Sequence, residues 1–197
     1  MRTGFFAEFR GRILLLGSLL SLMWLVQILD SFVIQPLLGS SLIQFGIQPR
    51  HLVGLRGILF APFLHAGFVH LIGNSVPFLV LGWLVMLRGG ISDFIGVSVI
   101  AAVVGGLGTW VIGSAGVHIG ASGVIFGYFG YLLMTGYFDR RAFSVLLSLF
   151  VAGLYGGLLW GVLPTQPGVS WEGHICGFAG GTLSAWLAAQ EEQPRLA

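Results

Sequence analysis

The sequence predicts an all-α polytopic membrane protein, in which six transmembrane helices form a bundle and a long, partly helical loop follows the first helix. Of the 197 residues, 56% are hydrophobic and 8% are charged, and the mean hydropathy is +0.94. Soluble domains carry about a quarter charged residues, so water is not the main solvent of this chain. Apolar runs of membrane-spanning length recur, and 32 glycines supply the small residues on which membrane helices pack.

Six apolar stretches are long enough to span a bilayer, which requires about 20 mainly apolar residues each. They cover approximately 13–34, 68–87, 91–112, 119–138, 143–163 and 171–189. The first is too long for a cleavable signal peptide and lacks a small-residue cleavage site, so we expect it to persist as a span. The length then predicts a single membrane domain over 1–197, with no room for a second globular domain.

The connections between the spans differ in character. The longest, 35–67, is too apolar for a free linker, which predicts short helices that pack on the bundle or lie in the membrane interface. The connection before the fourth span is rich in glycine, which permits irregular backbone just before Ser122. Three glycine pairs at helical spacing predict close packing of helices: Gly123/Gly127, Gly153/Gly157 and Gly173/Gly177.

The arginines predict the orientation of the spans. If the N-terminus is cytoplasmic, seven of the nine lie on that side and only Arg50 and Arg56 lie opposite, which is the positive-inside bias. The seven are Arg2, Arg10, Arg12, Arg88, Arg140, Arg141 and Arg195. We therefore expect both termini in the cytoplasm. Because the arginines are scattered and the net charge is only +2, we expect no nucleic-acid partner.

Four polar side chains share one depth in this topology. Spans two, four and six begin on the non-cytoplasmic side, where His70, Ser122 and His174 occupy first turns and Asn74 follows one turn after His70. A helix rises about 1.5 Å per residue, so all four lie close below one face of the bundle. Polar residues inside spans usually face the bundle interior or a watery cavity. The coincidence predicts a functional site.

These residue types are the groups that acyl transfer requires. Serine is a weak nucleophile until a base takes its proton, and His174 is the histidine best placed to do so from another helix. His70 and Asn74, four residues apart, share a helix face and offer two neutral donors to an oxyanion, and the backbone N–H groups of Ser122 and Gly123 would add to them. No Asp or Glu lies in the interior of the later spans, since Asp93 and Glu172 fall at span edges, so the sequence favours a Ser-His dyad over a triad.

Each of these residues also has a structural interpretation. A serine between glycines in a membrane helix is, taken alone, more often a packing feature than a nucleophile, and His70 with Asn74 could bond a neighbouring helix. His174 and the single cysteine, Cys176, are too few for a closed zinc site, so we expect no metal. A small transporter is a further alternative, but the spans contain no carboxylate relay. Other ionisable residues are expected in loops or at span edges: His51, His118, Asp93, Asp139 and Glu172.

Three blocks of the chain resemble the rhomboid intramembrane serine proteases. The stretch from Arg56 to Asn74 contains an H-x4-H-L-x2-N pattern that begins at His65. Gly120–Phe126 is similar to the nucleophile motif of that family, and His174–Gly181 is similar to its last-span histidine motif with an H-x2-G core. The resemblance covers the six-span core to Ala189, and the three blocks together are specific where the serine motif alone is not.

The resemblance implies a role for each matching residue. Ser122 would be the nucleophile and His174 the general base, with His70, Asn74 and the N–H of Ser122 as oxyanion donors. Supporting positions would be Gly120 and Gly123 beside the serine, Phe126 stacked on the base, Gly177 between spans four and six, and His65 as a structural or water-organising residue. The chain departs from the family pattern at Leu55, where tryptophan is common before Arg56, at Phe126, where some members have tyrosine, and at Gly173, where alanine is common.

The activity that the resemblance implies is endopeptidase cleavage of membrane-anchored proteins, within or near a transmembrane segment, without any cofactor. The partners would be transmembrane protein substrates and the lipid bilayer, and the compact form is typical of a bacterial plasma membrane. The alternative is a non-catalytic rhomboid-like protein that binds membrane clients. Such proteins usually lack the serine or the histidine, and this chain has both.

Overall fold

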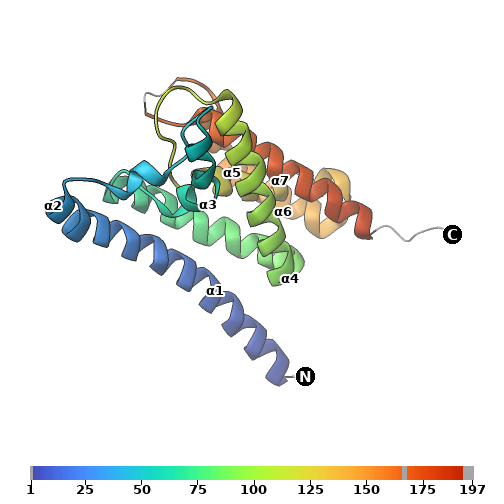
Figure 1. Ribbon diagram of the computed structural model, residues 1–197. Coiled ribbons are helices and arrows are strands. Elements are labelled where there is room, and N and C mark those ends of the chain that lie inside the picture. The colour runs from blue at the N-terminus through green and yellow to red at the C-terminus, as the bar shows by residue number, and fades with distance from the viewer. Residues whose placement is uncertain (1, 166–167, 193–197) are drawn as a thin grey trace.

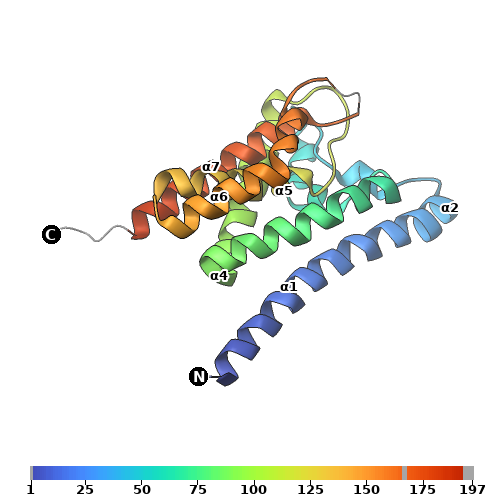
Figure 2. The same ribbon diagram turned by 180° about the vertical axis from the view of Figure 1, so that it is seen from behind.

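The computed structural model describes residues 2–165 and 168–192, and within them it forms a helical bundle (Figures 1 and 2). The long helices are α1 (Arg2–Leu29), α4 (Phe68–Ile112), α5 (Ser122–Phe138), α6 (Ala142–Tyr155) and α7 (Trp171–Glu192). The shorter elements are η1 (Asp30–Ile34), α2 (Gln35–Leu38), η2 (Leu42–Phe45), η3 (Leu52–Arg56), α3 (Gly57–Phe60), η4 (Ala61–Phe63) and η5 (Gly156–Val162). The predicted all-α fold with a partly helical first loop is confirmed.

The first helix leads into the long loop through a change of helix type. α1 continues into the π-helical turn η1, whose first residue, Asp30, is buried. The Asp30 carboxylate accepts hydrogen bonds from the Leu42 N–H (2.7 Å), the Ser41 hydroxyl (2.7 Å) and the Gln35 amide (2.9 Å). These bonds tie the start of the loop to the end of α1. They also compensate for the burial of the Asp30 carboxylate, which would destabilise the fold if it were unpaired.

α4 contains two of the predicted spans in one helical run. Gly90, with φ of +78°, lies outside helical backbone geometry and marks the break between them. Next to the break, Arg88 forms an ion pair with Asp139, at 2.9 Å. Burial raises the pKa of Asp139, but hydrogen bonds from the Ser144 hydroxyl and the Arg141 N–H, together with Arg88, hold that pKa below its ordinary value. The break and the end of α5 are therefore fastened to each other.

α5 is the central helix of the bundle. It packs on α7, α4 and α6, and most of its residues from Val124 to Gly136 are buried. By contrast, α1 contacts the bundle chiefly through α4, and its N-terminal half stands away from the other helices in both views (Figures 1 and 2). Ser122 is the first residue of α5, so the most enclosed helix of the fold carries the predicted nucleophile at its N-terminus.

Glycines set the distance between α5 and α7. A Cβ atom on Gly177 would overlap the carbonyl oxygen of Gly123, and one on Gly181 would overlap that of Gly127. The prediction of close packing was wrong for Gly153 and Gly157, around which a Cβ would meet nothing within 4 Å. Those two lie at the end of α6 and in η5, where the chain faces outward. Spacing alone does not distinguish a packed glycine from an exposed one.

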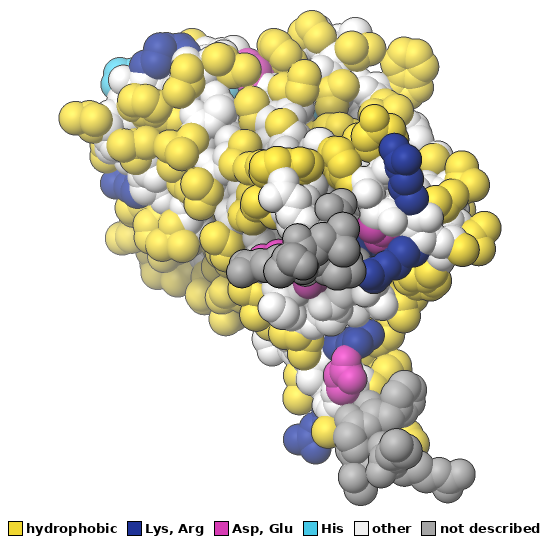
Figure 3. Space-filling model, turned by 90° about the vertical axis from the view of Figure 1, so that its right-hand side faces the viewer, with side chains coloured by type: hydrophobic (Ala, Val, Ile, Leu, Met, Phe, Trp, Pro, Cys, Tyr) yellow, Lys and Arg dark blue, Asp and Glu magenta, His cyan; other side chains and the backbone are white. Residues whose placement is uncertain are grey.

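Three helical stretches are long and apolar enough to cross a membrane, judged by length and composition: Phe6–Leu38, Phe68–Ile112 and Ala142–Val162. Figure 3 shows the end of the molecule at which α1 begins and α7 ends, where arginine and acidic side chains gather amid hydrophobic ones. Two of the arginines that predict the orientation, Arg195 and the side chain of Arg2, lie outside the described part of the structure.

Candidate active site

Ser122 is reached through a short stretch of irregular backbone. Gly120 has φ of +112°, a conformation that residues with a Cβ rarely adopt. Its N–H donates to the carbonyl of Ala61 (2.9 Å), which fastens the approach to the first loop. The side chain of Ser122 is half-buried. The N–H groups of Ser122 and Gly123 begin α5, and the first N–H groups of a helix have no partner within it.

His174, in the first turn of α7, contacts the predicted nucleophile directly. Its Nε2 lies 2.9 Å from the Ser122 Oγ, and its Nδ1 lies 2.8 Å from the carbonyl oxygen of Gly161 in η5. A carbonyl oxygen only accepts, so Nδ1 carries the hydrogen and Nε2 is left to accept the serine hydroxyl. The ring of Phe126 stacks on the imidazole with centroids 4.1 Å apart and planes 8° apart. The imidazole is thus fixed from three sides.

Gly161 is a site residue that the sequence did not reveal. It takes the place of a carboxylate as the partner of Nδ1, yet it contributes only a backbone carbonyl, which every residue possesses. A Cβ on Gly161 would come within 2.9 Å of the Phe126 ring and 3.3 Å of His174 Nδ1, so the missing side chain also makes room for the stack. Only the glycine-rich character of 153–161 could have pointed to it.

His70 presents an N–H to the space beside the serine. Its Nδ1 accepts the N–H of Ala66 at 3.4 Å, which leaves the hydrogen on Nε2. A Cβ built on Gly120 would be 2.8 Å from His70 Nε2 and 3.7 Å from Ser122 Oγ, so both atoms border the space that the glycine leaves open. Asn74 is buried, and its amide donates to the His70 carbonyl at 2.9 Å. One N–H of that amide is therefore engaged within α4.

His65 contacts both the His70 ring and the backbone that leads to Ser122. Its Nε2 accepts the N–H of Ala121 at 3.4 Å, and its ring meets that of His70 edge to face at 5.1 Å. It is 2% exposed. Burial, followed by the nearby His70, lowers the pKa of His65 from 6.5 to about 4. His65 is therefore neutral in the folded protein at neutral pH, as an acceptor of a backbone N–H must be.

This shift predicts a pH-dependent stability. Between pH 6.5 and pH 4 the unfolded chain binds a proton at His65 and the folded protein does not, so acidification favours unfolding by up to about 3 kcal/mol. We expect His65→Gln to flatten the fall in unfolding free energy across this window, measured by SDS titration in mixed micelles. His51→Gln, at an exposed histidine, is the control and should retain the wild-type slope. Equal slopes for all three proteins would contradict the assignment.

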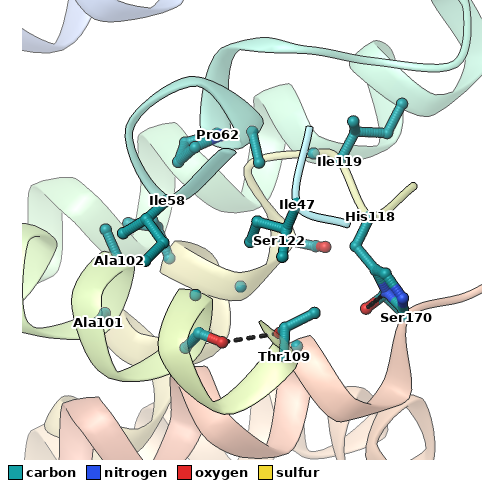
Figure 4. Close-up of a pocket in the computed structure, with 17 residues that line it drawn as sticks. Ile47, Ile58, Pro62, Ala101, Ala102, Thr109, His118, Ile119, Ser122 and Ser170 are labelled. Carbon is teal, nitrogen blue, oxygen red and sulfur yellow. Dashed lines mark hydrogen bonds between the residues drawn. The ribbon is translucent and has the colours of Figure 1, made fainter. Parts of the chain in front are cut away.

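A cavity of about 50 Å3 has Ser122 in its wall (Figure 4). Its wall includes Ser122, Thr109, His118 and Ser170 among apolar residues such as Ile58. The Thr109 hydroxyl donates to the Gly105 carbonyl at 2.7 Å, which the dashed line in Figure 4 marks. A cavity needs a volume of roughly 10–15 Å3 and some polar partners to hold one water molecule. This cavity is larger than that and has polar groups in its wall, so it can hold water next to the serine.

Metal ligands are not gathered at this site. Within residues 2–165 and 168–192, no group of three or more His, Cys, Asp or Glu side chains could hold a metal ion. Cys176 is a free, half-buried cysteine whose Sγ lies against Gly108. The chemistry of the arrangement is that of a hydroxyl, a neutral imidazole and N–H donors.

The chain is similar in sequence to a known domain family and to several known bacterial proteins. A sequence model of the Rhomboid domain matches residues 54–191, which contain every residue of the site. A protein of Mycobacterium tuberculosis (strain H37Rv), named "Uncharacterized protein Rv1337", is 41% identical over 185 residues, covering 89% of this chain and 75% of its own length. A protein of Mycobacterium leprae, "Uncharacterized protein ML1171", is 40% identical, covering 89% and 71%. The Bacillus subtilis protein named "Putative rhomboid protease YdcA" is 31% identical over 135 residues, covering 67% and 66%.

Proposed function

Since this integral membrane protein belongs to the rhomboid family, we propose that it is an intramembrane serine endopeptidase, cleaving membrane-anchored proteins within or near a transmembrane segment. The observation that carries the proposal is the 2.9 Å contact between His174 Nε2 and Ser122 Oγ. The two residues lie on different helices, 52 positions apart in the chain. A packing serine would not need an imidazole whose other nitrogen is fixed by a carbonyl.

The first step is attack by Ser122 Oγ on the carbonyl carbon of the scissile bond. His174 Nε2 takes the hydroxyl proton as the bond forms, and the Gly161 carbonyl holds the Nδ1–H and stabilises the imidazolium. The imidazolium then gives that proton to the departing amine, leaving an acyl-enzyme on Ser122. In the second step His174 accepts a proton from water, which attacks the ester carbonyl. The imidazolium then returns that proton to Ser122 Oγ as the Oγ–carbonyl bond breaks and the new carboxyl end is released. The cavity beside Ser122 supplies space for that water.

The oxyanion of each tetrahedral intermediate would be held by neutral donors. His70 Nε2–H borders the open space at Gly120, as does Ser122 Oγ, and this position suits the role. The N–H groups at the start of α5 belong to the same turn as Ser122 and would add to it. Asn74 would contribute its free amide N–H, or its engaged one after a rotation away from the His70 carbonyl. Gly120 would let the substrate backbone approach, Phe126 would hold the imidazole plane, and Gly177 would keep α7 close to α5.

The arginine distribution supports a cytoplasmic N-terminus and C-terminus, with the site near the opposite face. We place the protein in a bacterial plasma membrane, where its substrates would be transmembrane proteins of the same bilayer. No cofactor is required, because the nucleophile, the base and the donors all belong to the chain. A non-catalytic member that binds membrane clients is the competing function.

Covalent labelling separates the two functions without knowledge of the natural substrate. We expect a fluorophosphonate probe to label the purified wild-type protein in liposomes, and peptide mapping to locate the adduct at Ser122. The same preparation should cleave a generic model transmembrane substrate. Labelling without cleavage would mean that this substrate is unsuitable, whereas a folded protein that is neither labelled nor active would favour the non-catalytic binder.

A further inference from the structure

Glu172 is a buried acid for which the proposed reaction has no use. It lies two residues before His174, in the first turn of α7, and is 2% exposed. Its Oε1 accepts the N–H of Ser114 at 2.7 Å, and its Oε2 is buried without a hydrogen-bond partner among the described residues. A buried carboxylate with an unsatisfied oxygen costs stability, and an apolar residue of similar size would often be more favourable. Its presence therefore calls for a reason other than stability.

A second connection, through His118 and Ser170, also joins Ser114 to the start of α7. His118 is also buried, and its Nε2 lies 3.0 Å from the Ser114 carbonyl, so that nitrogen is the donor. Its Nδ1 then accepts the hydroxyl of Ser170 at 2.6 Å. Ser170 immediately precedes α7, and its carbonyl accepts the N–H of His174 at 3.1 Å. Figure 4 shows His118 and Ser170 side by side at the cavity wall.

Both connections join the same two segments. Ser114 and His118 lie in the stretch that leads into α5, and Ser170 and Glu172 lie at the start of α7. The leading stretch is held in turn by paired backbone hydrogen bonds between His118 and Ile47 in the first loop, at 2.8 and 2.9 Å. Ser122 follows directly on the first segment, and His174 lies in the second. Any relative shift of the two segments therefore changes the distance between the nucleophile and the base.

We propose that the bonds Glu172–Ser114 and Ser170–His118 form a clamp that sets the Ser122–His174 distance, and that Glu172 is a positioning residue of the dyad. The inference rests on the proposed function. The glycine contacts fix how closely α5 and α7 pack, while the clamp fixes the ends that carry the reacting groups. A misplacement of about 1 Å at such a site can cost on the order of 100-fold in rate.

The test compares two replacements of Glu172 in the full-length protein in liposomes. Glu172→Ala removes the bond to Ser114, and Glu172→Gln removes the charge but keeps an oxygen that can accept the same N–H. We expect Glu172→Ala to lower kcat and the rate of fluorophosphonate labelling about 10- to 100-fold with KM little changed, and Glu172→Gln to recover most of that loss. Ser184→Ala, at a buried serine further along α7, is the matched control and should behave as wild type.

Several results would overturn the clamp. The clamp would be wrong if the probe labels the Glu172→Ala variant at the wild-type rate. It would also be wrong if Glu172→Gln is labelled as slowly as Glu172→Ala, because the charge of Glu172 and not its bond to Ser114 would then set the rate. If Glu172→Ala does not fold, Ser170→Ala tests the other connection, and a wild-type rate there would count against the proposal. Failure of the wild type itself to be labelled would remove the proposed function and the clamp with it, whereas normal labelling of every variant removes the clamp alone.

Discussion

Replacing Ser122 with alanine is expected to reduce cleavage of a transmembrane substrate by at least about 10^4-fold while the protein remains folded. The change removes one oxygen from a half-buried side chain at the start of α5, so packing is hardly altered. His174→Ala should cause a loss of the same order, because the hydroxyl is a weak nucleophile without its base. The double variant should be no worse than either single one, since the two residues act as a unit.

The measurement is the cleavage rate in proteoliposomes, with the thermal midpoint in detergent recorded for each variant. Ser184→Ala removes a hydroxyl from α7 far from the site and should leave both quantities unchanged. Losses that multiply in the double variant would mean that Ser122 and His174 contribute independently, and the dyad would be wrong. Residual cleavage equal to wild type in Ser122→Ala would assign the activity to a contaminant.

The helices of the fold were predictable from the sequence because the membrane imposes a simple rule on length and hydrophobicity. The residues of the candidate site were predictable for a related reason. A span fixes the depth of its residues, so Ser122 and His174 could be placed at one level before any packing was known. His70 entered by the same argument. What depth could not give was the direction of each side chain.

Backbone groups and contacts between loops were beyond the sequence. The carbonyl of Gly161 orients the imidazole, but no residue type marks a carbonyl. The sequence predicts Glu172 at a span edge, and its burial follows from the course of the loop that contains Ser114. These two features depend on tertiary geometry that hydrophobic periodicity does not encode. The amide of Asn74, by contrast, makes a local bond to the His70 carbonyl one turn earlier in α4, and the depth of the residue does not fix that direction.

Gly181→Ala is expected to weaken the protein markedly, although it adds a single methyl group. The new Cβ would overlap the carbonyl oxygen of Gly127 and approach the Tyr131 nitrogen within 2.8 Å. Both are backbone atoms of the central helix α5, so they cannot swing away as a side chain could, and α7 must move from α5. Overpacking of this kind costs about 1–3 kcal/mol, occasionally more. The unfolding free energy from SDS titration should fall accordingly.

Gly153→Ala is the matched control, since it makes the same change in a helix where a Cβ meets nothing within 4 Å. Alanine is the better helix former by about 0.8–1 kcal/mol, so this variant should be as stable as wild type or more so. Gly181 lies two turns from His174 on the same helix, and a displaced α7 would carry the base away from Ser122. Labelling of Gly181→Ala should therefore slow as well. Equal stability and labelling of the two alanine variants would show that α5 and α7 do not meet through their glycines, and that something other than helix packing holds the base in place.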